Sequence, residues 1–249
     1  MTQLPGTASS LVLGMLSGPR KPVQVLGSGA SCAYLLLGDE LLPVEASDAL
    51  GLPRAVRLAV ASHAAPFAGL RPGMSGFVGT RSIQVGALAV RIGGWWEPRR
   101  IPTGVRRDRL ADVAGSLPLC PPDWSPSAPA ASLLGRGPGL TPAGDDVLAG
   151  MLLGARNNRR VHQQVWHDVR AAGLQRTTAL SAALLQDAAE GYAIPAVRTL
   201  LRWLTGRGMA AAGDVLRPVM KVGHTSGLAL AWGVVAGADR ALAESKEAA

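Results

Sequence analysis

The chain has 249 residues, of which 48% are hydrophobic and 17% are charged, and its formal net charge is +8. A chain that is disordered throughout is excluded, because disorder requires low hydrophobicity together with high net charge. The length suffices for one large or two small domains with a sizeable core.

The excess positive charge comes almost entirely from arginine, since lysine occurs only at Lys21, Lys221 and Lys246. The arginines are scattered along the chain, and only ten residues are aromatic. Proteins that bind nucleic acids usually combine a basic patch with aromatic side chains that stack on bases. The composition therefore favours a protein with no nucleic-acid partner, and the charge would attract small anions instead.

The cysteines and the apolar runs indicate the compartment. Cys32 and Cys120 form neither a disulfide framework nor a CxxC motif. The apolar run at 11–16 is too short for a signal peptide and lacks a charged segment before it. No apolar stretch reaches the ~20 residues of a membrane span. We expect a cytoplasmic protein with reduced cysteines and no membrane association.

Residues 1–20 form a poorly defined segment, and residues 21–115 have the short apolar runs of a β-rich part. Strands are expected at 23–26, 33–37, 55–61, 74–78 and 82–92. Gly86 interrupts the last of them and predicts a bulge or bend. A helix is expected at 106–115. Since no helical pattern separates the strands, the sequence predicts an antiparallel sheet or a barrel-like unit.

Residues 116–132 contain five prolines and predict a loop or linker. The part at 133–249 is helical, with helices expected at 142–156, 160–172, 177–190, 195–205, 209–221 and 226–244. The predicted fold class is therefore α+β, as two closely packed parts or one compact domain overall.

The most informative segment is Gly-Arg-Gly-Pro-Gly-Leu-Thr-Pro-Ala-Gly-Asp-Asp at 135–146. Thr141 is a good N-cap residue, and Pro142 suits the first helical position. A glycine-rich loop before a helix N-terminus presents free N–H groups and the positive end of a dipole, which favour an anion. The segment lacks the lysine of a phosphate-binding P-loop.

Asp145 and Asp146 follow this loop and precede an apolar helix, which we expect to be buried. Two adjacent buried carboxylates are costly without a cation, an arginine or a ligand rich in donors. One carboxylate could hold Mg²⁺ beside a phosphate. The alternative is that both acids only complement the helix dipole. Gly150 and Gly154, four residues apart, suit close helix packing.

Two other helix starts have similar chemistry. The segment at 223–227 contains His224, which could bind an anion or act as a general acid or base, and then Thr225 and Ser226. Thr177 and Thr178 precede another helix. Alternatively, each of these residues is only a helix cap. Converging helix starts would form a pocket for a phosphate, carboxylate or carbamoyl group.

The segment at 135–152 resembles the characteristic motif of the AllH-like family, and the segments at 177–181 and 223–227 are similar to that family too. The resemblance implies a subunit of oxamate carbamoyltransferase, an enzyme of purine (allantoin) nitrogen catabolism. It also implies that this subunit works together with two others. That enzyme converts oxalurate and phosphate into oxamate and carbamoyl phosphate. The implied partners are small anionic substrates and other enzyme subunits.

The resulting hypothesis places Asp145, Asp146 and His224 in catalysis, with Mg²⁺ as a cofactor that the two aspartates could hold. The small anion would be bound by backbone and hydroxyl groups of Gly137, Gly139, Thr141, Thr177, Thr178, Thr225 and Ser226. The alternatives are a non-catalytic subunit that binds a small anion and a regulatory or scaffold subunit.

Overall fold

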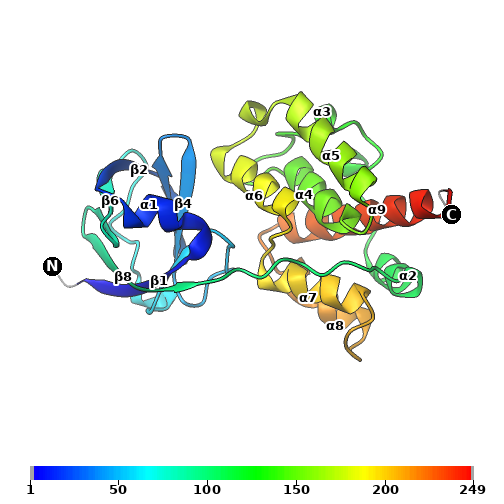
Figure 1. The fold of residues 1–249 in the computed structure, drawn as a ribbon, viewed down its shortest axis with the longest axis horizontal. Helices are drawn as coiled ribbons and strands as arrows, with labels where there is room; N and C mark the ends of the chain where they lie inside the picture. Colours follow the sequence, from blue (N-terminus) through cyan, green and yellow to red (C-terminus); the bar gives the residue numbers. More distant parts are fainter. Residues whose placement is uncertain (1–2, 248–249) are drawn as a thin grey trace. The chain divides into compact units, whose positions relative to one another are not determined.

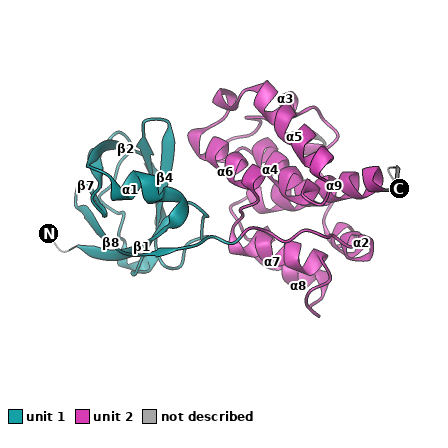
Figure 2. Cartoon of the chain, in the orientation of Figure 1, with its two compact units in different colours: residues 1–99 teal, residues 100–249 magenta. Residues whose placement is uncertain are grey.

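The computed structural model describes residues 3–247, with strands first and helices afterwards (Figure 1). The chain divides into two compact units, 1–99 and 100–249 (Figure 2). The first unit is strand-rich and the second is helical, which confirms the α+β class.

In the described part of the first unit, eight strands form a closed barrel in the order β1-β5-β4-β3-β2-β6-β7-β8. The strands are β1 (Leu4–Ser9), β2 (Lys21–Ser28), β3 (Cys32–Leu37), β4 (Glu40–Glu45), β5 (Val56–Leu58), β6 (Ser75–Gly79), β7 (Ser82–Val85) and β8 (Leu88–Trp96). Three short helical segments accompany them: η1 (Ser10–Val12), α1 (Leu13–Ser17) and η2 (Ser62–Ala64). The closed barrel is more specific than the predicted choice between a sheet and a barrel-like unit.

The alternation of side chains along each strand explains the barrel core. In β3 every second residue is buried, and Ala33 and Leu35 are fully inaccessible. Because successive side chains point to opposite faces of a strand, one face of β3 fills the barrel interior. Val25 of β2 and Val90 of β8 join the same core.

Two strands lie where the sequence pattern predicts none. β1 falls within residues 1–20 and pairs with β8 in parallel and with β5 antiparallel, so it closes the barrel. β4 pairs with β3 antiparallel and with β5 in parallel. Two pairings in the barrel, β1 with β8 and β4 with β5, are therefore parallel, and the barrel is not a purely antiparallel sheet. Gly86 has φ +55° and lies between β7 and β8, where it makes the turn of a hairpin.

The second unit consists of helices α2 (Arg107–Ser116), α3 (Ala130–Leu133), α4 (Ala143–Ala155), α5 (Arg159–Ala172), α6 (Ala179–Glu190), α7 (Pro195–Leu204), α8 (Ala212–Met220) and α9 (Ser226–Glu247), with η3 (Pro122–Trp124) and η4 (Leu174–Arg176). Every residue of α4 is buried, as its apolar sequence predicts. Within residues 3–247, no helix is long and apolar enough to cross a membrane.

Helices α4 and α9 touch backbone to backbone through glycines. A Cβ on Gly150 would lie 2.3 Å from the carbonyl oxygen of Leu230, and one on Gly154 would lie 2.2 Å from that of Val234. From the other side, a Cβ on Gly233 would lie 2.1 Å from the carbonyl oxygen of Val147. Residue numbers rise together along both helices, so α4 and α9 run parallel and their N-termini lie at the same end.

Candidate functional site

Side-chain contacts join the N-termini of α4, α6 and α9. Thr141, just before α4, has its Oγ1 atom 3.1 Å from the Oγ atom of Ser226, the first residue of α9. Thr177, before α6, donates a hydrogen bond to Asp145 in the first turn of α4. Thr178 Oγ1 donates to the carbonyl oxygen of Leu140 at 2.5 Å. The three predicted helix starts therefore meet at one place.

The loop before α4 needs glycine for its backbone conformation. Gly135, Gly137 and Gly139 have φ values of +76°, +121° and +90°. A Cβ on Gly135 would lie 2.4 Å from the carbonyl oxygen of Arg176, and one on Gly137 would lie 2.9 Å from the amide nitrogen of Ala143. Gly137 and Gly139 are exposed, so their backbone is open to a ligand.

Asp145 is 2% exposed, and both of its carboxylate oxygens are occupied. Oδ1 accepts a hydrogen bond from the Gly135 amide at 2.7 Å, and Oδ2 accepts one from the Thr177 hydroxyl. Asp145 thus ties the glycine loop and the start of α6 to α4. Because each carboxylate oxygen already accepts a hydrogen bond from another part of the chain, its geometry is that of a positioning residue.

Asp146 is 5% exposed and differs from its neighbour. Its Oδ2 atom is buried and has no hydrogen-bond partner within the described residues. Burial raises the pKa of Asp146 to about 7, the Ser226 hydroxyl lowers it, and the charge of Asp145 raises it. A buried carboxyl oxygen without a partner is costly unless a ligand supplies a donor or a cation.

Parallel α4 and α9 bring two positive helix ends together beside these acids. Each helix N-terminus carries roughly half a positive charge and several free N–H groups. The carboxyl groups of Asp145 and Asp146 offset part of this potential, and the exposed loop around Gly137 and Gly139 retains unblocked backbone. The arrangement can therefore bind a small anion beside a carboxyl that carries or releases a proton near neutral pH.

The site offers few ligands to a metal ion. Residues 3–247 contain no group of three or more His, Cys, Asp or Glu side chains that could hold a metal. Asp145 already accepts two hydrogen bonds, so Mg²⁺ would depend on Asp146 together with phosphate and water oxygens.

The structure places the other predicted residues as follows. Pro142 occupies the N-cap position of α4, and Thr141 bonds Ser226 instead of capping, which corrects the predicted cap. Thr178 does cap α6, because its Oγ1 accepts from the Ser181 amide at 3.0 Å.

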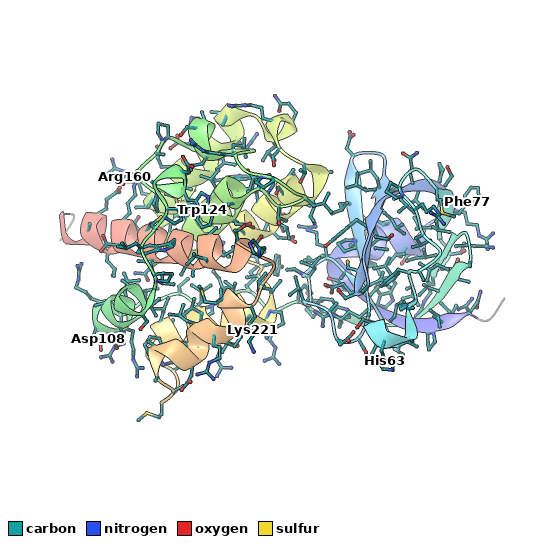
Figure 3. All side chains as sticks on the ribbon, turned by 180° about the vertical axis from the view of Figure 1, so that it is seen from behind. His63, Phe77, Asp108, Trp124, Arg160 and Lys221 are labelled. Carbon is teal, nitrogen blue, oxygen red and sulfur yellow. The ribbon has the colours of Figure 1, made fainter. Side chains whose placement is uncertain are left out.

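Thr225 is half-buried, whereas His224 is exposed and lies in the turn between Lys221, labelled in Figure 3, and α9. Within residues 3–247 the His224 ring has no hydrogen-bond partner. The geometry thus unites both aspartates with Thr141, Thr177, Thr178 and Ser226, and leaves His224 at the surface.

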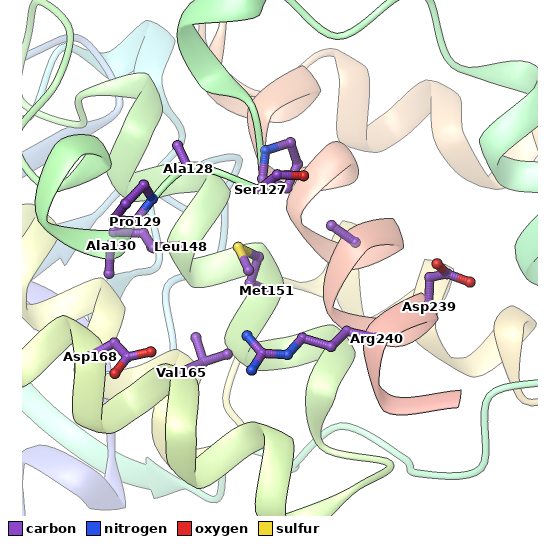
Figure 4. Close-up of a pocket in the computed structure, with 12 residues that line it drawn as sticks. Ser127, Ala128, Pro129, Ala130, Leu148, Met151, Val165, Asp168, Asp239 and Arg240 are labelled. Carbon is purple, nitrogen blue, oxygen red and sulfur yellow. The ribbon is translucent and has the colours of Figure 1, made fainter. Parts of the chain in front are cut away.

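A separate cavity of about 460 Å³ lies along the middle of α4 and α9 under the proline-rich loop (Figure 4). Leu148 and Met151 contribute to its lining, with polar groups from Asp168, Asp239 and Arg240. The sequence motifs do not indicate it, because its residues come from four distant segments. Asp168 accepts from Gln164 at 2.8 Å and Arg240 pairs with Glu244 at 3.5 Å, so two of its polar groups already have partners.

Comparison with known proteins gives one family. Residues 133–238 match the model of the family described as oxamate carbamoyltransferase subunit AllH, which confirms the resemblance in the motif at 135–152. The match lies wholly within the helical unit and includes the three helix starts. Comparison with curated proteins and with solved structures gives no match.

Proposed function

We propose that this chain, whose residues 133–238 match the AllH family, is a subunit of an enzyme that transfers a carbamoyl group between oxalurate and phosphate. In that reaction a phosphate oxygen attacks the ureido carbonyl carbon, and the bond from this carbon to the amide nitrogen breaks. The products are carbamoyl phosphate and oxamate. The single observation that supports a role for this chain in the chemistry is the unpartnered, buried Oδ2 atom of Asp146 beside three converging helix starts.

The phosphate in this proposal lies against the exposed backbone around Gly137 and Gly139 and the starts of α4, α6 and α9. Backbone N–H groups and the positive helix ends favour a small anion there. The Thr141 and Ser226 hydroxyls, 3.1 Å apart, and the hydroxyl groups of Thr177 and Thr178 surround the same place. His224 and Thr225 stand on the solvent side, where they would contact the substrate or another subunit.

Asp146 handles the proton in this proposal. The attacking hydrogen phosphate must lose a proton, and the departing oxamate nitrogen must gain one. A carboxyl whose pKa is raised to about 7 can accept the first proton and return it to the nitrogen, so the overall reaction balances without an external acid. Asp145 holds the loop in place, and Mg²⁺, if bound, would use Asp146 and the phosphate.

The test is formation of carbamoyl phosphate from oxalurate and phosphate, with the chain alone and with the other subunits of the enzyme. We expect turnover only in the complete mixture, with a loss of at least about 100-fold for Asp146→Asn. Asp168→Asn, which changes the same kind of group outside the site, is the matched control and should retain activity. Absence of carbamoyl phosphate in every mixture would contradict the proposal.

The second candidate function is that of a non-catalytic subunit that binds an anion, and calorimetry together with the activity assay distinguishes it from the first. Binding of phosphate or oxamate by the chain, with turnover that is insensitive to Asp146→Asn, would identify a non-catalytic subunit that binds an anion. For Asp145 a non-catalytic role is favoured, because both of its carboxylate oxygens already accept hydrogen bonds from the chain.

A further inference from the structure

Ser226, the first residue of α9, lies beside the Asp146 carboxyl, and the function proposed above uses it only as part of the surroundings of the phosphate. Helices α4 and α9 run parallel, and a Cβ on Gly150 would lie 2.3 Å from the carbonyl oxygen of Leu230. Asp146 and Ser226 lie one turn before this contact on their own helices, so the two side chains are at the same level. The Ser226 hydroxyl forms a hydrogen bond with the Asp146 carboxyl. The packing of the two helices therefore brings this serine to the buried acid.

The junction between α8 and α9 fixes the backbone of Ser226. The amide of Gly227 donates to the carbonyl oxygen of Val222 at 2.9 Å. A Cβ on Gly227 would lie 2.0 Å from the carbonyl oxygen of Val219 in α8, so the start of α9 packs directly against the end of α8. Gly227 is buried and Ser226 is half-buried. The serine hydroxyl is therefore carried by a backbone that has little freedom to move.

Hydrogen bonding also fixes the Ser226 hydroxyl group itself. Its Oγ atom lies 3.1 Å from the Oγ1 atom of Thr141, in addition to its bond with Asp146. A hydroxyl has one proton to donate and two lone pairs that accept. An ionised carboxylate only accepts, so Ser226 donates to Asp146 and accepts from Thr141. The single proton of Ser226 is then used within the chain, which leaves it none to donate to a bound phosphate.

We infer that Ser226 is a positioning residue, whose hydroxyl holds the Asp146 carboxyl in one orientation and does not itself bind the phosphate. This role rests on the function proposed above, in which Asp146 transfers the proton. The Oδ2 atom of Asp146 has no hydrogen-bond partner within residues 3–247, so the bond with Ser226 restrains rotation of the carboxyl while Oδ2 stays unused. Small errors in the placement of a reacting group slow a reaction strongly. A serine that only bound phosphate would instead change the affinity for phosphate.

The experiment is steady-state kinetics of carbamoyl phosphate formation from oxalurate and phosphate in the complete mixture of subunits. Ser226→Ala should lower kcat by at least about tenfold and change the KM for phosphate by less than about twofold. Ser226→Thr retains the hydroxyl and should stay within about twofold of the wild-type kcat. Thr141→Val leaves Ser226 in place without its second partner and should lower kcat by about threefold, which keeps the test possible if Ser226→Ala does not fold.

Ser245→Ala is the matched control, because Ser245 lies near the other end of α9 and its hydroxyl donates to the carbonyl oxygen of Ala241 at 2.7 Å. This variant should leave kcat and KM unchanged. In the Asp146→Asn background, Ser226→Ala should add no further loss, because the serine acts through the aspartate. A raised KM at unchanged kcat, or unchanged kinetics in Ser226→Ala, would overturn this inference alone. Absence of turnover with the wild-type protein would contradict the proposed function and this role together.

Discussion

The barrel and the helical unit each bury a carboxyl group whose pKa is raised to about 7, but the two groups differ in their hydrogen-bond partners. Glu45 is 1% exposed, and its carboxylate accepts from the Leu52 amide at 2.9 Å and the Gly51 amide at 3.2 Å. Arg57 Nε lies 4.0 Å away. Burial raises the pKa of Glu45 to about 7, and the two amides and Arg57 lower it. Asp146 reaches a similar pKa with one oxygen that has no partner in the described chain.

The comparison shows that a raised pKa does not by itself mark a functional carboxyl. Glu45 stands in the strand register between Cys32 on β3 and Arg57 on β5, and it fixes the loop that follows β4. Its hydrogen bonds are complete, so its role is structural. What distinguishes Asp146 is unused hydrogen-bonding capacity at a place where helix ends favour an anion.

The largest expected effect tests the structural role of Glu45. Glu45→Ala removes the acceptor of two backbone amides and the counter-charge of Arg57, so the free energy of unfolding should fall by about 3–4 kcal/mol. Urea denaturation at neutral pH measures this. Glu40→Ala, at the exposed start of the same strand, is the control and should change stability by under about 0.5 kcal/mol. Equal stability of the two variants would mean that the hydrogen bonds and the ion pair of Glu45 do not stabilise the fold.

The next effect concerns the backbone contact that holds α4 beside α9. Gly233→Ala puts a Cβ 2.1 Å from the carbonyl oxygen of Val147, so the helices must separate, at a cost of about 2–3 kcal/mol. Thermal unfolding followed by circular dichroism measures it. Gly213→Ala on α8, where a Cβ meets open space, should be neutral or slightly stabilising. A stable Gly233→Ala variant would show that the helix starts do not depend on this contact.

The pH dependence of stability tests the raised pKa of Asp146. The pKa of Asp146 is about 7 when folded and near 3.8 ordinarily, so folding favours its protonated form. Its contribution to stability is full below pH ~4, declines as pH rises and is lost above pH ~7. Between pH 5.5 and pH 8, Asp146→Asn should therefore gain about 2 kcal/mol relative to wild type, at ~1.4 kcal/mol per pKa unit.

Glu45→Gln provides the matched comparison for this titration. The pKa of Glu45 is also raised to about 7, so Glu45→Gln should likewise gain stability relative to wild type as the pH rises from 5.5 to 8. Gln turns an NH₂ group towards the amides of Gly51 and Leu52, however, so this variant should stay less stable than wild type at both pH values. If Asp146→Asn is also destabilised at pH 8, the Oδ2 atom of Asp146 has a structural role as the Glu45 carboxylate has, and the proposed difference between the two acids is wrong.

The smallest expected effect concerns the contact between helix starts. Thr141→Val removes the 3.1 Å interaction with the Ser226 hydroxyl and should cost about 1 kcal/mol in denaturant unfolding. Thr141→Ser retains the hydroxyl and should behave as wild type. An unchanged Thr141→Val variant would mean that the two hydroxyls are held by other groups.

Sequence pattern predicts the elements with strong periodicity. The apolar helix at 142–156 and the strand at 33–37 correspond closely to α4 and β3, because their side-chain patterns are unambiguous. β1 escapes prediction, because Leu4–Ser9 contains proline, glycine and small residues and is a strand only through its pairing with β5 and β8. Tertiary pairing decided its conformation.

In the candidate site, too, local sequence pattern predicts some features and the tertiary fold decides the others. The glycine motif and the adjacent acids indicate a buried helix start, and the structure buries both aspartates. The sequence cannot show that both oxygens of Asp145 accept hydrogen bonds whereas Oδ2 of Asp146 accepts none, since Thr177, a partner of Asp145, is 32 residues away.

In the proposed function, the buried Oδ2 atom of Asp146 is left without a hydrogen-bond partner because it serves catalysis. The direct test measures, in one preparation, the stability of Asp146→Asn at pH 8 and its production of carbamoyl phosphate from oxalurate in the assembled enzyme. We predict a variant at least as stable as wild type with activity reduced at least about 100-fold. Wild-type activity in a folded, assembled Asp146→Asn variant would contradict the account.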